Sequence, residues 1–168
     1  LYLFDKDSST PSWTYERDSG NFISVAISAN SNYIIVGGED VDGDELILFG
    51  KEGNTPIWTY TTGNSVLDVS VSADGSHIFV GTIDHKLRLF SKDSSTPLWT
   101  YTTTGDVYSV SISSDGEYTV AVDGDTTNKP KLYLFNKDSN SPLWTKELGS
   151  AGEDLRAVEI SEDGEYIV

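Results

Sequence analysis

The side chains that most often carry out catalysis are scarce in this chain. Its 168 residues include no cysteine, and His77 and His85 are the only histidines. Without cysteine there are no thiolate nucleophiles, disulfides, zinc fingers or iron–sulfur clusters, and two histidines without a third ligand do not make a zinc site. No Gly-x-Ser-x-Gly turn presents a serine nucleophile. The sequence therefore nominates no catalytic, cofactor-binding or metal-binding residue, and we expect a protein that is not an enzyme and holds no cofactor.

Two acidic clusters around glycine are the remaining candidates for chemistry. They are Glu39–Glu45 and Asp123–Asp125. Carboxylates at alternate positions resemble part of a calcium loop, but neither cluster has the full twelve-residue pattern with its distal bidentate glutamate. We interpret both clusters as solvated turns, and calcium binding is the alternative.

Composition narrows the class of partner. With 11 basic and 27 acidic residues the net charge is −16, which argues against nucleic-acid binding because that needs a cationic face. No apolar run approaches the roughly 18 residues of a spanning helix, so we expect no membrane insertion. A hydrophobic fraction of 37% is too high for a disordered acidic tail. The sequence therefore predicts one globular unit, or part of one.

An internal repeat organises the whole chain. A Leu-x-Leu-Phe phrase occurs four times, and a tryptophan follows each phrase nine residues later: Trp13, Trp58, Trp99 and Trp144. A Ser-x-Asp-Gly phrase recurs between them at 72–75, 113–116 and 161–164, and its first copy has changed to Ser-Ala-Asn-Ser at 28–31. Such a period of 41–45 residues between tryptophans is typical of repeat architectures.

The residues within each repeat predict β-strands joined by turns. Residues 107–112 alternate apolar and polar side chains, and residues 118–122 form a β-branched run suited to a strand covered on both faces. Asp-Gly supplies a tight turn after the first strand, and the Lys-Asp-Ser-Ser-Thr-Pro phrase supplies another. We expect four antiparallel strands in each repeat, here called a, b, c and d, for example 107–112, 118–122, 131–135 and 143–145.

The chain resembles the WD40-like and quinoprotein-like (PQQ-like) β-propeller repeats. The segment from Ser72 to Phe90 is similar to a WD40-type blade, with Asp84 at the place of that family's turn-stabilising aspartate. The segment from Asp5 to Trp13 has the Asp-to-Trp spacing of the quinoprotein tryptophan-docking motif. The Gly-His pair and the Trp-Asp dipeptide of WD40 repeats do not occur. The resemblance implies an all-β fold, a propeller of four-stranded antiparallel blades.

The strand count predicts three complete blades and two half-blades. We expect a c–d half-blade at 1–18, blades at 19–62, 63–104 and 105–147, and an a–b half-blade at 148–168. The repeated aromatic residues are then core between blades. The remaining blades come from the same longer chain, or a second copy completes a ring of eight, or the two half-blades of one chain close a ring of four.

Loop variation points to one face of this propeller. The a–b and c–d turns change little between repeats, whereas the b–c loops (37–45, 81–86, 123–131) and the d–a loops (16–21, 61–65, 102–106, 147–154) differ in length. Because loops on a scaffold can vary without disturbing its packing, we expect a protein or a small ligand to bind the b–c/d–a face. The alternatives are part of a quinoprotein-like or hydrolase propeller enzyme with active residues in blades not shown, and a structural cell-surface module. The composition slightly favours an exported prokaryotic protein, in the cell envelope or outside the cell, over a cytoplasmic one.

Overall fold

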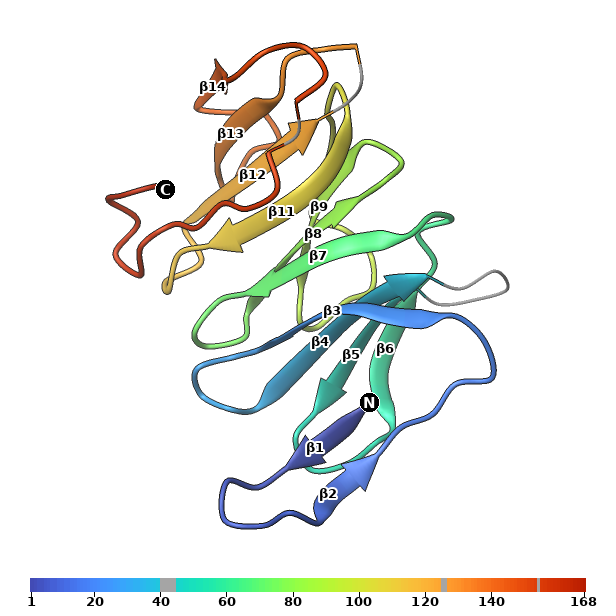
Figure 1. The fold of residues 1–168 in the computed structure, drawn as a ribbon. Helices are drawn as coiled ribbons and strands as arrows, with labels where there is room; N and C mark the ends of the chain where they lie inside the picture. Colours follow the sequence, from blue (N-terminus) through green and yellow to red (C-terminus); the bar gives the residue numbers. More distant parts are fainter. Residues whose placement is uncertain (40–44, 125–126, 154) are drawn as a thin grey trace.

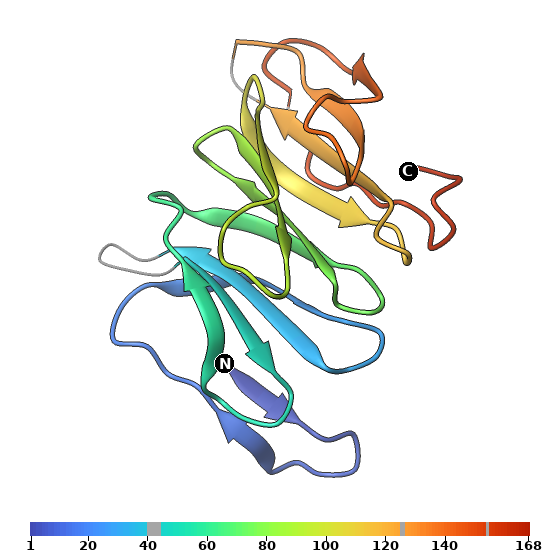
Figure 2. The ribbon, with the colours of Figure 1, turned by 180° about the vertical axis from the view of Figure 1, so that it is seen from behind.

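A computed structural model of the chain describes residues 1–39, 45–124, 127–153 and 155–168. Three four-stranded antiparallel sheets and one two-stranded sheet make up the fold, so the all-β prediction is confirmed, and the sheets are consistent with propeller blades. No helix in the described ranges is long and apolar enough to cross a membrane. The sheets lie in a row, with the first strands at one end and the C-terminal segment at the other (Figures 1 and 2).

Each sheet is a simple meander in chain order. The N-terminal pair contains β1 (Tyr2–Phe4) and β2 (Pro11–Thr14). Sheet 1 contains β3 (Asn21–Ile27), β4 (Tyr33–Glu39), β5 (Leu46–Gly50) and β6 (Pro56–Tyr60). Sheet 2 contains β7 (Val66–Val71), β8 (His77–Thr82), β9 (Lys86–Ser91) and β10 (Trp99–Thr102). Sheet 3 contains β11 (Asp106–Ile112), β12 (Tyr118–Gly124), β13 (Lys131–Asn136) and β14 (Trp144–Glu147).

The Ser-x-Asp-Gly phrases form the turns between the first two strands of sheets 2 and 3. Ser72 Oγ donates to Asp74 at 2.8 Å, and the same bond recurs from Ser113 to Asp115 at 2.6 Å. Gly75 has a φ of 77°, a region that a residue with a Cβ avoids. The turns also join neighbouring sheets, because the amide of Ala73 donates to the carbonyl of Ser114 at 3.0 Å and the amide of Ser114 donates to that of Glu162 at 2.9 Å.

The first copy of this turn has serine where the others have glycine. Ser31 adopts a φ of 59°, which costs a residue with a Cβ about 1 kcal/mol. We therefore expect Ser31→Gly to raise the free energy of unfolding by about 0.5–1 kcal/mol, measured by urea denaturation. The reverse change at Gly75 should lower stability, and a destabilised Ser31→Gly variant would contradict this account.

One aromatic contact is repeated at every junction between sheets. A tryptophan in the last strand of one sheet packs against the phenylalanine of the next sheet, with ring centroids 5.6 Å apart for Trp13–Phe49, 5.7 Å for Trp58–Phe90 and 5.2 Å for Trp99–Phe135. Each of these indole N–H groups also donates to a lysine carbonyl of the next sheet at 2.8–2.9 Å: Lys51, Lys92 and Lys137. The prediction that the repeated aromatic residues form the core between repeats is confirmed at these three junctions.

The first strands of the three sheets lie side by side along the inner edge of the row. Asp68 of β7 joins them, because its carboxylate accepts from Ser24 of β3 at 2.9 Å and from Ser109 of β11 at 3.1 Å. Valines of β7 and β11 pack directly over a glycine of the preceding sheet: Val66 lies over Gly37, and Val107 lies over Gly81. A side chain at either glycine has no space.

The C-terminal segment is less regular than the sequence pattern predicts. Within its described residues, 148–153 and 155–168, the only strand pairing is the single bridge between Ile160 and Ile167. A hairpin still forms, since Glu159 and Val168 exchange two backbone hydrogen bonds of 2.9 and 3.0 Å. In the complete sheets the second strand is also paired with a third, and that second ladder, which stabilises an extended conformation, is not present here.

Candidate functional site

The loops that vary between repeats gather at one end of the molecule. The described residues of the connections between second and third strands, and of those between the fourth strand and the following sheet, lie to the right in Figure 1, opposite the Ser-x-Asp-Gly turns. Backbone hydrogen bonds join the two sets. The amide of Thr103 donates to the carbonyl of His85 at 2.8 Å, and the amide of Leu148 donates to that of Pro130 at 2.9 Å. The two kinds of loop are therefore joined in sheet 2 and in sheet 3. We call the described loop residues at this end of the molecule the loop face: 16–21, 37–39, 45, 61–65, 81–86, 102–106, 123–124, 127–131 and 147–153.

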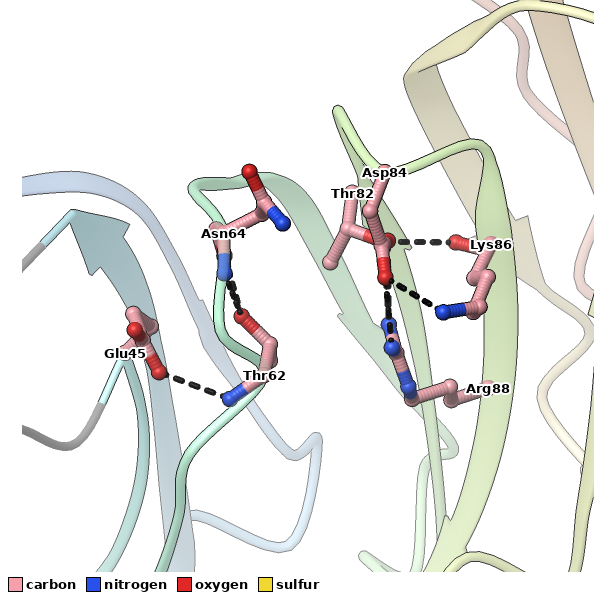
Figure 3. A network of polar contacts seen from close by, with 7 residues as sticks. All are labelled: Glu45, Thr62, Asn64, Thr82, Asp84, Lys86 and Arg88. Carbon is pink, nitrogen blue, oxygen red and sulfur yellow. Dashed lines mark hydrogen bonds and ion pairs between the residues drawn. The ribbon is translucent and has the colours of Figure 1, made fainter.

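A glutamate holds the loop face together at sheet 1. Glu45 is buried immediately before β5, and its carboxylate accepts from the backbone amide of Thr62 at 2.7 Å (Figure 3). Thr62 also uses its hydroxyl to donate to the carbonyl of Asn64. The connection after β6 is therefore positioned by the strand next to it.

In sheet 2 the carboxylate of the loop face belongs to an aspartate in the turn itself, unlike Glu45 in sheet 1. Asp84 lies in the turn between β8 and β9 and accepts from Arg88 Nη2 and Lys86 Nζ, both at 2.9 Å, and from the hydroxyl of Thr82 (Figure 3). The Arg88 side chain is buried and lies 6.0 Å from the ring centroid of Tyr60. This network is local to one turn, as expected for the turn-stabilising aspartate that the resemblance places at this position.

These contacts control the ionisation of Asp84. Burial disfavours its carboxylate, but the hydrogen bonds from Arg88, Thr82 and Lys86 outweigh burial and lower the pKa of Asp84 from 3.8 to about 2. Because the pKa of Asp84 is lower in the folded state than in the unfolded state, its ionisation stabilises the fold. This contribution is complete at any pH above the unfolded pKa. That contribution is lost as the pH falls from 4 through 2.

We expect Asp84→Asn to lower the free energy of unfolding at neutral pH by about 1.5–3 kcal/mol, because it leaves the buried Arg88 cation without a charged partner. The variant should also lose less stability than the native chain as the pH falls from 4 to 2. Urea denaturation across this pH range measures both effects. Asp93→Asn is the control, since Asp93 pairs with Lys92 in solvent and such pairs contribute little. Equal pH dependence in the native and Asp84→Asn chains would contradict the assignment.

A third arrangement holds the loop face at sheet 3. Asp123 is fully buried in β12, and its carboxylate accepts from the amides of Thr104 and Lys131 at 3.0 and 2.8 Å and from the Tyr133 hydroxyl at 2.7 Å. The amide of Gly105 also donates to it at 3.2 Å. Burial, together with this neighbouring carboxylate, raises the pKa of Tyr133. Asp123 therefore connects the loops that contain Thr104 and Lys131 to β12.

The two histidines lie at opposite ends of sheet 2 and do not meet. His77 begins β8, and its Nδ1 would lie 2.8 Å from a Cβ at Gly116 of the next sheet, much as the Tyr33 ring packs against Gly75. His77 thus takes the packing position that tyrosine takes in the other copies. His85 occupies the short turn with a φ of 60°, and its Nε2 lies 3.2 Å from Asp106.

The structure describes only part of each acidic cluster. Asp40, Asp42, Asp44 and Asp125 lie outside the described residues, and in the described part of the chain no group of three or more histidine, cysteine or acidic side chains could hold a metal ion. Glu45 and Asp123 are buried acceptors, so the interpretation as solvated turns is wrong for these two residues. Sequence reasoning missed their role, although each adjoins a strand end, where a carboxylate can reach loop amides.

Comparison with known families identifies one repeat. Residues 54–91 match the family model described as WD domain, G-beta repeat, and no curated protein matches the chain. The matched segment runs from β6 through β9 and contains Trp58, Asp84 and the aromatic junction to Phe90. It begins just before the last strand of one sheet and ends with the third strand of the next, so the sequence repeat spans two sheets. The chain therefore contains a WD40 repeat at residues 54–91.

Proposed function

We propose that this chain is a non-catalytic β-propeller scaffold and that its loop face binds a protein partner. The WD40 repeat supports a binding scaffold, because such repeats typically bind proteins. The loop face is the surface where the repeats depart from one another. Binding loops on a rigid scaffold show this combination of a constant frame and variable connections.

The proposal rests on a difference in hydrogen bonding between the two ends of the sheets. At the Ser-x-Asp-Gly end one hydrogen-bond pattern recurs, from Ser28 to Asn30, from Ser72 to Asp74 and in the later copies. At the loop face each sheet uses a different carboxylate, namely Glu45, Asp84 or Asp123. Separate anchors allow the loops to differ from sheet to sheet without disturbing the strands that carry them.

A loop exchange tests the proposal. A phage-displayed random peptide library is selected on the immobilised native chain, and selected peptides are measured by calorimetry. In the test variant, residues 83–85 replace both 39–44 and 124–130, so that Glu45 and Asp123 stay in place. We expect peptide binding to this variant to fall by at least about tenfold, which corresponds to 1.4 kcal/mol.

Two control variants separate the loop face from other causes. Replacement of the turn 51–54 by residues 92–95 alters the opposite end and should leave binding unchanged. Conversion of Asp40, Asp42 and Asp44 to asparagine keeps loop length but removes charge, so it exposes purely electrostatic adsorption of basic peptides. Undiminished binding to the loop-exchange variant overturns the proposal, provided that its thermal unfolding remains cooperative.

A further inference from the structure

A hydroxyl stands directly before a proline in all four turns between a third and a fourth strand. The four dipeptides are Thr10-Pro11, Thr55-Pro56, Thr96-Pro97 and Ser141-Pro142. These turns lie to the left in Figure 1, at the same end of the sheets as the Ser-x-Asp-Gly turns and opposite the loop face. All four hydroxyl-bearing residues are exposed. We call their side chains the proline-turn hydroxyls.

The proline-turn hydroxyls do not shape the turns in which they lie. Within the described part of the chain, none of the four takes part in a hydrogen bond. A different serine holds the turn, because Oγ of Ser8, Ser94 and Ser139 each accepts from the amide two residues later at 3.0 Å. The fold therefore makes no use of the hydroxyl before the proline.

The four copies of the turn distinguish these two kinds of hydroxyl. The second copy has Gly53 at the place of Ser8, Ser94 and Ser139, so the turn forms without that serine. The hydroxyl before the proline is nevertheless present in every copy. A β-branched residue suits the extended conformation that proline imposes on its neighbour, but Ser141 is not β-branched. The property that all four positions share is therefore the hydroxyl itself.

An exposed aliphatic side chain follows two residues after the hydroxyl in each complete sheet. Ile57, Leu98 and Leu143 are 50%, 54% and 55% exposed. Residues two apart in an extended segment share a face, and exposure alternates in this way from Thr96 through Pro97 to Leu98. Sheet 2 has a complete sheet on each side (Figure 1), so the exposure of Leu98 does not arise from an end of the row. A group attached to the hydroxyl would lie over this apolar side chain.

The charges of these turns favour a neutral group. An exposed carboxylate lies three residues before each hydroxyl, at Asp7, Glu52, Asp93 or Asp138, and the lysine that precedes it is already paired with it. A phosphoryl group would add about −1.5 to −2 charges at each site, in a chain whose net charge is already −16. A neutral sugar adds no charge, and its C–H groups can pack against an aliphatic side chain such as Leu98.

We propose that Thr10, Thr55, Thr96 and Ser141 are acceptor sites for O-linked glycosylation. Segments that combine serine or threonine with proline are typical O-glycosylation acceptors. The donor is a nucleoside diphosphate sugar, and a glycosyltransferase of the cell is the catalyst. The hydroxyl oxygen bonds to the anomeric carbon of the sugar, and the bond from that carbon to the diphosphate breaks. The nucleoside diphosphate leaves with the bonding electrons, and the hydroxyl proton passes to a base of the transferase.

Peptide mass spectrometry of the protein isolated from its own cells tests this assignment. We expect hexose or N-acetylhexosamine on the peptides that contain the proline-turn hydroxyls, and electron-transfer fragmentation should place the sugar on those residues. No Asn-x-Ser or Asn-x-Thr triplet occurs in the sequence, so N-linked sugars do not complicate the result. Four unmodified hydroxyls overturn the proposal, and so does phosphate at these positions or sugar found only on other residues.

Substitutions at one site separate the hydroxyl from the shape of the side chain. In the same cells, Thr96→Val keeps the β-branched shape and should lose the sugar at residue 96, whereas Thr96→Ser should keep it. Thr100→Ala is the control, because Thr100 is also exposed but no proline follows it, and it should leave the sugars unchanged. Residue 96 is exposed, so circular dichroism should show folded variants. Sugar retained on the same peptide of Thr96→Val, or lost from Thr96→Ser, overturns the proposal.

A variant with alanine at all four positions separates this proposal from binding at the loop face. It should carry no sugar and still bind the selected peptides as the native chain does, because the two surfaces lie at opposite ends of the sheets. Hydrophobic-interaction chromatography should retain it longer than the modified protein, since Ile57, Leu98 and Leu143 are then uncovered. Shorter or equal retention would contradict the position assigned to the sugars. Weak peptide binding by both proteins would contradict only the loop-face proposal.

Discussion

Replacement of Gly81 by valine should lower the free energy of unfolding by about 3 kcal/mol or more, as severe overpacking does. A Cβ at Gly81 would lie 2.5 Å from Val107 Cγ1 and 3.1 Å from Val110 Cγ1. Both valines belong to the next sheet and are buried, so they cannot move aside without opening the junction. Urea denaturation followed by tryptophan fluorescence measures the loss.

Two further variants separate steric pressure from other effects of valine. Gly53→Val should be nearly neutral, because a Cβ at Gly53 has no atom within 4 Å. Val107→Ala combined with Gly81→Val should recover part of the stability that Gly81→Val alone removes, since it vacates the clashing space. If the double variant loses more free energy of unfolding than the two single variants lose together, the junction does not depend on this contact.

Asp123→Ala is the second change with a large expected effect. It removes the acceptor for two buried donors, the Gly105 amide and the Tyr133 hydroxyl, and for the partly buried hydrogen bonds from the amides of Thr104 and Lys131. Each buried donor left without a partner costs about 1–3 kcal/mol. We expect a loss of about 3 kcal/mol or more in the free energy of unfolding, measured by urea denaturation. Asp138→Ala should change stability by less than about 0.5 kcal/mol, because Asp138 is a surface residue.

A conservative variant at the same position has a separate spectroscopic signature. Asp123→Asn keeps an oxygen acceptor but removes the negative charge next to the Tyr133 hydroxyl. Burial and this carboxylate both raise the pKa of Tyr133, so the variant should lower that pKa, and alkaline titration by tyrosinate absorbance can follow it. An unchanged Tyr133 titration would mean that the carboxylate does not control this hydroxyl.

The sequence was sufficient to predict the strands and their four-stranded antiparallel sheets because its signals are periodic and local. Alternation along 107–112 and the β-branched run at 118–122 correspond to β11 and β12. The nine-residue interval from Phe49 to Trp58 spans one turn and two strands, so it recurs wherever that geometry recurs. The Asp-Gly turns follow from the positive φ that Gly75 and Gly116 adopt.

Hydrogen bonds between a side chain and a backbone group far away in the sequence could not be predicted in the same way. The indole of Trp58 donates to the carbonyl of Lys92, and a carbonyl acceptor places no demand on residue type. Glu45 and Asp123 are similar in composition to solvated acidic turns, and only the path of the neighbouring loops makes them buried anchors. Much of the candidate site depended on these contacts, so the sequence located the loop face but not what holds it.

The turn-to-turn hydrogen bonds have a consequence for how the molecule opens. The amides of Ala73 and Ser114 donate across junctions between successive sheets, so their protons exchange with solvent when those junctions separate. In a row of units that interact with their neighbours, opening starts at the ends and the free energy of each opening differs. Native-state hydrogen exchange at these amides therefore measures the free energy of opening of each junction separately. The values would show which junctions open together and which open independently.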